Sequence, residues 1–197
     1  MRLKNFIIIA SSFFLLGVSQ PNPEELTSTC VACHGADGNS QVGLWPSLAG
    51  QNFNYLKKQL LLIQSGQRSV PEMTGLMEKF SEKELEGIAS FYSNKKTNIG
   101  RASKELVDLG SKLYYVGNLE KGIPACYACH SPKGRGNYPA GYPLLSGQKT
   151  DYISKTLKDY RSGVRQYSDQ SAIMVSISYK LDDKEIAALA SFINGLH

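Results

Sequence analysis

Two Cys-x-x-Cys-His pentapeptides hold the residues of this 197-residue chain that are best suited to chemistry. They are Cys30–His34 and Cys126–His130, and they use all four cysteines and two of the three histidines. This spacing is the attachment signature of c-type haem. We therefore predict two covalently bound haem c groups, attached through Cys30, Cys33, Cys126 and Cys129. His34 and His130 are then the proximal ligands of the two irons.

Other proteins use Cys-x-x-Cys pairs in three different ways. A structural zinc site can be built from Cys or from Cys and His, but it would leave the His after each second Cys without a role. A thioredoxin-like dithiol needs a βαβ context, which this sequence does not predict. Two disulfides would suit an exported protein. Haem attachment explains more of the pattern than these alternatives, because the two motifs use the whole cysteine inventory.

Residues 1–19 resemble a secretory signal peptide. Arg2 and Lys4 precede an apolar run over Phe6–Val18, and small residues follow at a plausible cleavage site. The run is shorter than the roughly 20 residues that a membrane-spanning helix needs, which favours cleavage over an uncleaved tether. We therefore expect a periplasmic protein, with at most a peripheral association with the membrane. Export fits the chemistry, because bacteria attach c-type haem outside the cytoplasm.

Charge is unevenly distributed along the remainder of the chain. Residues 20–100 carry seven basic and eight acidic side chains, a net charge of −1, whereas residues 101–197 carry thirteen and nine, a net charge of +4. Such asymmetry can orient a protein on a charged partner. The sequence has no run of Lys and Arg, so it does not support binding of nucleic acid.

The two halves of the chain are copies of one another. Residues 45–51, with the sequence WPSLAGQ, recur as YPLLSGQ at residues 142–148, an offset of 97. Nearer the end of each half the offset is 101, because one loop is longer by four residues in the second copy. A period this long indicates duplicated domains. We predict an N-terminal domain over residues 20–98 and a C-terminal domain over residues 101–197.

Each half has the pattern of a helical domain. Asn52 can cap a helix that ends near Gln64 and has an apolar stripe along one side. Residues 81–84 and 182–185 have the capping-box pattern at the start of the last helix of each half. A further helix is expected over Lys104–Tyr115. Since no long alternation of apolar residues predicts a sheet, we expect an all-α fold.

The start of the N-terminal domain departs from the repeat. Pro21 and Pro23 interrupt the few residues between the expected cleavage site and Cys30, so a short first helix is expected there. The equivalent helix of the C-terminal domain is long enough to cross the last helix, and we expect it to do so through Leu109, Leu113 or Tyr114.

The sixth ligand of each iron follows by elimination. Only His197 remains among the histidines, so both irons cannot have two His ligands. Methionine is the usual alternative and raises the reduction potential. The C-terminal domain contains only Met174, whereas the N-terminal domain offers Met73 and Met77. We predict Met73 and Met174, because these two share the offset of the following helix, and we expect each on a loop before that helix.

Pro46 and Pro143 stand at matching places in the two halves. A metal-bound His normally donates its second ring N–H to a fixed acceptor. Backbone carbonyls near these two prolines are candidate acceptors. A simple role in a turn explains the prolines nearly as well.

Several short segments match the pattern of a known family, in order and in both halves. They are Cys30–Gly35, Pro46–Gln51, Glu72–Gly75, Pro124–Pro132, Tyr142–Gln148, Ile173–Met174 and Asn194–His197. On these segments the chain resembles the dihaem cytochrome c4 family. The resemblance implies two tandem class I cytochrome c domains related by a pseudo-twofold axis, with haem propionates facing each other across the interface. It also places Met73 and Met174 at the axial positions of the family.

The resemblance implies a periplasmic electron-transfer protein that is not an enzyme. It would pass single electrons between redox protein partners, such as a membrane cytochrome complex and a terminal oxidase, and we expect a monomer. Two six-coordinate irons leave no open position for a substrate. The alternatives are an electron-accepting cytochrome subunit of a dehydrogenase and a dihaem peroxidase. A peroxidase, like a haem gas sensor, needs one iron with an exchangeable ligand.

Overall fold

A computed structural model describes residues 22–197, and the regular structure in this range is helical. Two isolated β-bridges are the only β-type pairing within that range. The all-α fold is therefore confirmed. The predicted signal peptide and its cleavage site lie outside the described residues. Within residues 22–197 no helix is long and apolar enough to cross a membrane.

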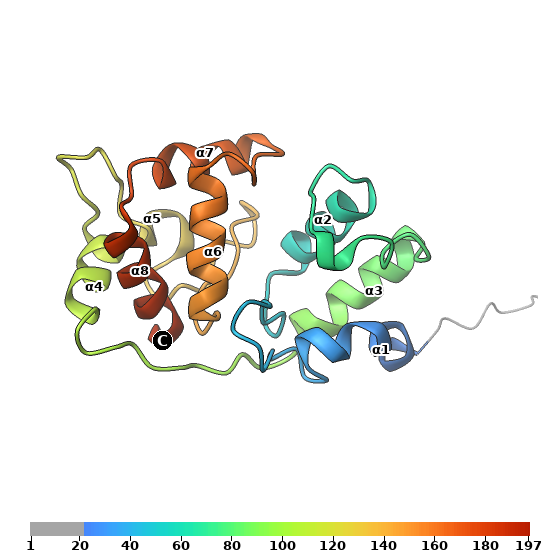
Figure 1. The fold of residues 1–197 in the computed structure, drawn as a ribbon. Coiled ribbons are helices and arrows are strands. Elements are labelled where there is room, and N and C mark those ends of the chain that lie inside the picture. The colour runs from blue at the N-terminus through green and yellow to red at the C-terminus, as the bar shows by residue number, and fades with distance from the viewer. Residues whose placement is uncertain (1–21) are drawn as a thin grey trace, which may run out of the picture.

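The helices form two groups that lie side by side (Figure 1). The N-terminal group contains α1 (Pro23–His34), α2 (Phe53–Gln64), the 3-10 turn η1 (Pro71–Met73) and α3 (Glu82–Ser93). The C-terminal group contains α4 (Val107–Tyr115), α5 (Tyr127–His130), α6 (Thr150–Arg161), α7 (Asp169–Ser178) and α8 (Asp183–Gly195). An extended segment along one side connects them, and each group has its own buried apolar cluster.

The predicted helix caps are confirmed. The Asn52 side chain accepts a hydrogen bond from the Tyr55 backbone N–H at 3.3 Å, and α2 begins at the next residue. Ser81 and Asp182 each form a complete capping box, at the start of α3 and α8. Each box satisfies backbone N–H groups that have no partner inside the helix. The last helix of each domain therefore begins where its local sequence requires.

The first helix of the N-terminal domain is not short, which corrects the prediction. α1 spans twelve residues, from Pro23 through the first haem-attachment motif, and Asn22 caps it by accepting the Glu24 N–H at 3.1 Å. Proline at the first helical position costs nothing, because its missing N–H would have had no partner there. Pro23 therefore starts the helix and does not interrupt it. α4 is the shorter helix, with nine residues beginning at Val107 and not at Lys104.

The first and last helices of each domain pack against each other, α1 on α3 and α4 on α8. The α4–α8 crossing is centred on Gly110, which the sequence analysis did not select. A Cβ at Gly110 would overlap the Ala188 carbonyl and lie 2.6 Å from the Phe192 Cβ. Leu113 and Tyr114 are buried beside the crossing as expected. The absence of a side chain on Gly110 is what lets the two helix backbones approach.

The longer loop of the second copy folds into a helix. Met174 lies within α7 and not on a loop, which corrects the prediction, whereas Met73 ends the short turn η1. Ser168 and Ser171 form a capping box at the start of α7. The four additional residues of the second copy therefore give room for more helix in front of α8.

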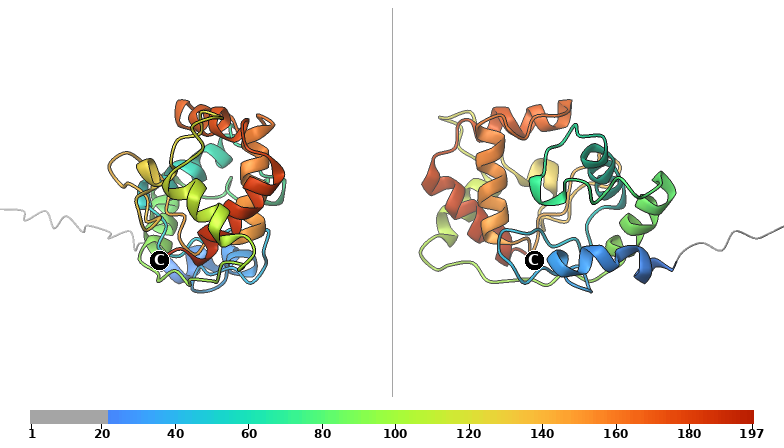
Figure 2. Two further views of the ribbon diagram at one scale, coloured as in Figure 1. Left: turned by 90° about the vertical axis from the view of Figure 1, so that its left-hand side faces the viewer. Right: turned by 45° about the vertical axis from the view of Figure 1, so that its right-hand side comes forward.

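The two domains exchange equivalent hydrogen bonds across their interface. Gln148 accepts the Ser47 N–H at 2.8 Å and donates to the Ser47 carbonyl at 2.9 Å. Gln51 accepts the Leu144 N–H at 2.8 Å and donates to the Leu144 carbonyl at 3.0 Å. The two glutamines are related by the repeat offset of 97, and so are their partners Ser47 and Leu144. The interface thus has the pseudo-twofold symmetry that the resemblance implied. Figure 2 shows the ribbon of the two domains from two further directions.

Candidate functional site

A cavity of about 600 Å³ lies between the domains and extends into both, a size common for cofactor sites. Residues of the two haem-attachment motifs and both predicted axial methionines line it. They are Cys30, Cys33, His34, Met73, Cys126, Cys129, His130 and Met174. The structure therefore brings every sequence-predicted site residue to one cavity. Most of the other lining side chains are apolar, which suits a porphyrin ring.

The two histidines are oriented by the same type of hydrogen bond. The Nδ1 atom of His34 donates to the Pro46 carbonyl at 2.9 Å, and that of His130 donates to the Pro143 carbonyl at 3.1 Å. A carbonyl can only accept, so Nδ1 carries the proton and Nε2 is free to bind iron. Burial lowers the pKa of both rings, against a smaller opposite effect of the proline carbonyls. The prediction about the prolines is confirmed.

A glycine in each domain fixes the proline segment beneath the histidine. The Gly38 carbonyl accepts the Leu48 N–H at 2.7 Å, and the Gly134 carbonyl accepts the Leu145 N–H at 2.7 Å. Each acceptor lies just after a haem-attachment motif, and each donor lies two residues after the proline. These bonds close the loop locally. The position of the proline carbonyl is therefore set by the backbone that carries the motif.

No disulfide joins the four cysteines of the two haem-attachment motifs. Without attached haem, burial raises the pKa of the Cys30 thiol and raises that of the Cys126 thiol to about 11. Cys126 also lies 3.8 Å from the Leu113 carbonyl. Both cysteines of each motif line the cavity, where they can form two thioether bonds to one haem.

The three candidate methionines differ in their surroundings. Met77 is 3% exposed and belongs to the buried apolar cluster of the N-terminal domain. Met73 and Met174 are only partly buried and pack against the edges of the two clusters. All three line the cavity. Met77 therefore has an evident packing role, whereas the other two stand at matching places at the cavity wall.

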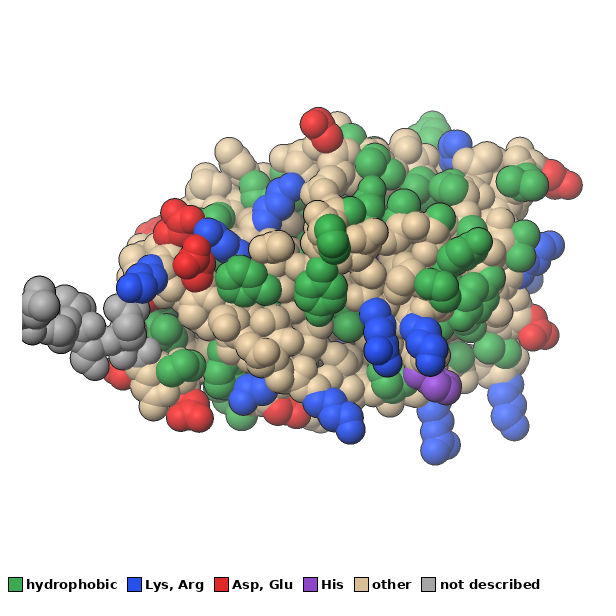
Figure 3. All heavy atoms as spheres, turned by 180° about the vertical axis from the view of Figure 1, so that it is seen from behind, with side chains coloured by type: hydrophobic (Ala, Val, Ile, Leu, Met, Phe, Trp, Pro, Cys, Tyr) green, Lys and Arg blue, Asp and Glu red, His purple; other side chains and the backbone are tan. Residues whose placement is uncertain are grey.

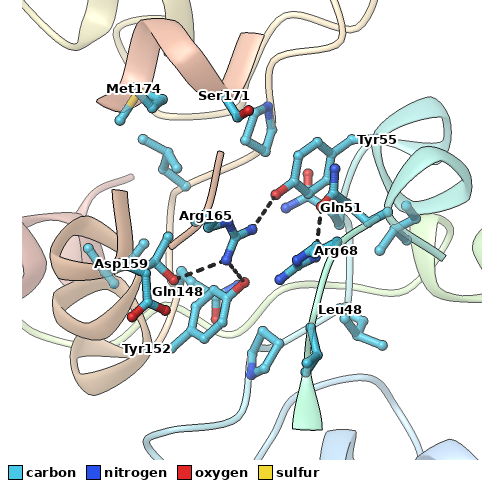
Figure 4. Close-up of a pocket in the computed structure, with 18 of the residues that line it drawn as sticks. Leu48, Gln51, Tyr55, Arg68, Gln148, Tyr152, Asp159, Arg165, Ser171 and Met174 are labelled. Carbon is cyan, nitrogen blue, oxygen red and sulfur yellow. Dashed lines mark hydrogen bonds between the residues drawn. The ribbon is translucent and has the colours of Figure 1, made fainter. Parts of the chain in front are cut away.

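A polar cluster at the domain interface was missed by the sequence analysis. Arg165, which follows α6, donates to the hydroxyl groups of Tyr152 and Tyr55, at 3.2 and 3.1 Å (Figure 4). Arg68 donates to Gln59 at 2.7 Å nearby. A signal was present in the sequence, since Arg68 and Arg165, like Tyr55 and Tyr152, are separated by the repeat offset of 97.

Comparison with known proteins identifies the family. A family model described as cytochrome c matches residues 107–197, and one described as cytochrome c oxidase, cbb3-type, subunit III matches residues 24–91. Cytochrome c4 of Azotobacter vinelandii is 45% identical over 179 residues, which cover 86% of this chain and 85% of that protein. The chain belongs to the cytochrome c4 family. The crystal structure of reduced recombinant cytochrome c4 from Pseudomonas stutzeri matches with a TM-score of 0.86 and 42% identity, over 89% of this chain and 97% of that chain.

Membership of the cytochrome c4 family confirms three predictions. The fold consists of two tandem cytochrome c domains, haem c is bound covalently, and the protein belongs to the electron-transfer cytochromes. A further relative, the thiosulfate dehydrogenase electron acceptor of Stutzerimonas stutzeri, is 35% identical over 83% of this chain and 76% of its own length. This relative is therefore named as the electron acceptor of a dehydrogenase.

Proposed function

We propose that this cytochrome c4 is a periplasmic electron carrier without substrate chemistry of its own. The observation that carries the proposal is the matched pair of sites. In each domain a His with its Nδ1 proton bound to a proline carbonyl lines the same cavity as a methionine. Bound haem supplies one single-electron centre to each domain. The chain then needs only to hold the iron ligands, exclude water and bind partners.

We propose His34 and Met73 as the iron ligands of the N-terminal domain, and His130 and Met174 as those of the C-terminal domain. The proline carbonyls hold each imidazole in the tautomer that presents Nε2. Thioether ligation from the opposite side would complete six-coordination and raise the potential. The buried position of Met77 in the apolar cluster favours Met73 as the ligand.

The domain limits remain part of the proposal. We retain residues 20–98 and 101–197 as the two domains, with removal of residues 1–19 on export. The mature chain would then carry its positive charge in the C-terminal domain. In Figure 3, Lys and Arg side chains follow the lower edge of the face on the side of that domain.

This distribution supports docking on acidic redox partners. A membrane cytochrome complex as donor and a terminal oxidase as acceptor fit a carrier that works as a monomer or lies peripherally on the membrane. A second candidate is the electron-accepting cytochrome of a dehydrogenase. The 35% identical relative with that name favours it, since a carrier of the same architecture can serve either kind of partner.

The decisive experiment is the optical spectrum of the purified oxidised protein, recorded with and without cyanide, and of the reduced protein with carbon monoxide. A carrier with four protein ligands should show two covalent haems per chain, a far-red sulfur-to-iron band and no rapid ligand binding. Rapid binding at one haem would overturn the carrier proposal in favour of a peroxidase or a sensor. Recovery of zinc, or of haem that acid–acetone extracts, would contradict the site itself.

A further inference from the structure

A buried phenol in the N-terminal domain has no hydrogen-bond partner. Tyr92, near the end of α3, is fully buried, and its hydroxyl makes no hydrogen bond within residues 22–197. Buried polar groups are normally hydrogen-bonded, because burying one without a partner is costly. Tyr92 also lines the cavity that contains the haem-attachment residues. Its hydroxyl is thus an unpaired polar group at the wall of the haem cavity.

The packing around the ring fixes the position of this hydroxyl. A Cβ added at Gly38 would lie 2.7 Å from the Tyr92 Cδ1 atom, so the ring lies directly against the Gly38 backbone. The ring of Phe91 packs edge-on against it, with a centroid distance of 5.1 Å. Cys30 packs against the same apolar cluster. Since such a close-packed core leaves a ring little freedom, the hydroxyl cannot turn away to find another partner.

Two side chains of α1, Cys30 and Thr27, lie beside the Tyr92 hydroxyl. Burial raises the pKa of the Tyr92 phenol and Cys30 raises it further, whereas Thr27 has a smaller, opposite effect. Burial also raises the pKa of the Cys30 thiol, and the Tyr92 hydroxyl opposes that effect. Thr27 already donates to the Pro23 carbonyl at 2.9 Å and, unlike Cys30, does not line the cavity. The sulfur of Cys30 is therefore the acceptor that faces the hydroxyl at the cavity wall.

Attachment of haem changes the hydrogen bonding of the Cys30 sulfur. A thiol has a proton to donate, whereas a thioether sulfur has none and can only accept. The Tyr92 hydroxyl then becomes the donor of the pair. We propose that Tyr92 donates a hydrogen bond to the thioether sulfur of Cys30 and thereby raises the reduction potential of the haem in the N-terminal domain. This inference rests on the proposed function only in requiring haem on Cys30.

The direction of the O–H bond determines the sign of the effect. Its positive end points at a sulfur that is bonded to the haem, and it therefore stabilises the ferrous state, which has one more electron than the ferric state. Hydrogen bonding close to a haem is one of the means by which a protein sets the reduction potential. Tyr92 is thus a positioning residue, because it acts through the haem attachment and not on the iron.

The C-terminal domain lacks this interaction. The residue that matches Tyr92 at the repeat offset of 101 is Ile193, which is buried and lines the same cavity. A buried tyrosine does lie near Cys126, but this residue, Tyr114, belongs to α4 and donates to the Ser131 carbonyl at 2.7 Å. Its proton is therefore bound to the backbone. The inferred hydrogen bond acts on one of the two haems, which consequently differ despite the shared fold.

Tyr92→Phe in the full haem-loaded chain tests the proposal, with Tyr114→Phe as the matched control. Each substitution removes one hydroxyl from a fully buried tyrosine, but only the first removes the donor assigned to a thioether sulfur. The ratio of reduced to oxidised haem is measured by spectroelectrochemistry at fixed applied potential. The far-red sulfur-to-iron band checks the ligation of both irons, and circular dichroism checks the fold.

We expect Tyr92→Phe to lower this ratio at one haem by about threefold or more, where each tenfold change corresponds to 59 mV for one electron. The ratio falls because the ferrous state loses a stabilising dipole. Tyr114→Phe should change the ratio by less than about twofold at either haem, since its hydroxyl points at a carbonyl. An unchanged ratio in Tyr92→Phe, or an equal fall in Tyr114→Phe, would overturn the proposal.

Two further variants separate the hydrogen bond from packing and from Thr27. Tyr92→Leu should lower the same ratio by a similar factor, because it removes the same proton, whereas a fall in Tyr92→Leu alone would assign the effect to packing and refute the proposal. Thr27→Val removes the alternative acceptor and should leave the ratio unchanged. A rise would show that the hydroxyl donates to Thr27 in the wild type and bonds to the sulfur only when Thr27 is lost, which also refutes the proposal. Failure of the carrier proposal would appear separately, as rapid ligand binding at iron in the wild type.

Discussion

Substitution of Gln148 by methionine tests how strongly the two domains support each other. The Gln148 amide is 5% exposed and makes both of its cross-domain hydrogen bonds to the backbone of Ser47, at 2.8 and 2.9 Å. Methionine has a similar length but makes neither bond. Most of the expected loss therefore comes from hydrogen bonding and only a little from packing.

The size of the effect follows from what is left unpaired. The buried N–H and carbonyl of Ser47 lose their partners, and each unsatisfied buried group costs about 1–3 kcal/mol. Water can enter and bind these groups if the interface opens, so we expect the lower part of the range obtained by adding the costs of the two groups. We expect the N-terminal domain to lose about 2–3 kcal/mol of stability, although the substituted residue belongs to the C-terminal domain.

Trp45 provides a probe for the domain that should respond. It is the only tryptophan and lies two residues before Ser47. Haem quenches its fluorescence in the folded domain, so guanidinium unfolding followed at Trp45 reports the N-terminal domain. Gln41→Met is the matched control, because Gln41 is exposed in that domain and bonds only to the nearby Asn39 carbonyl. The control should change stability by less than about 0.5 kcal/mol.

The double variant with Gln51→Met adds a second test. The two glutamines support one interface, so opening it by the first substitution should make the second cost less than it does alone. Strict additivity would mean that the two bonds act independently. A Trp45 transition for Gln148→Met that stays within about 0.5 kcal/mol of the wild type would refute the reasoning, since the domains would then fold without mutual support.

Three other predictions concern the iron ligand, the helix crossing and the partner. Met73→Ala should remove half of the far-red sulfur-to-iron band and admit cyanide at one haem, whereas Met77→Leu should leave both unchanged and cost under about 1.5 kcal/mol; the reverse pattern would place the ligand at Met77. Gly110→Ala should lose about 1–3 kcal/mol in thermal unfolding, because its Cβ meets a backbone carbonyl. Gly87→Ala is the tolerated control, since its Cβ meets only the end of the Leu26 side chain. Electron-transfer rates with an acidic partner should fall as the salt concentration rises, because salt screens the attraction between the two proteins beyond the Debye length, roughly 10 Å at 0.1 M. A rate that does not change with salt would indicate apolar docking.

The sequence alone determined the chemistry of the sites and the plan of the fold. Haem attachment needs two thiols and a histidine within five residues, so the whole motif can be read from Cys30–His34 without knowing the fold. Helix caps such as Ser81 are equally local, because a cap acts within one turn. The duplication was visible for the same reason, since each copy retains its own order of motifs.

Tertiary structure decided what depends on residues that are distant in sequence. Ser47 and Gln148 are 101 positions apart, and only the docking of the domains brings the amide to that backbone. Arg165 had no distinguishing local pattern, and its importance comes from burial among side chains of both domains. α7 formed where a longer loop was expected, because the added residues carry a cap that the alignment of the repeats concealed. Contacts between distant residues depend on the packed arrangement of helices, and a linear pattern does not contain that arrangement.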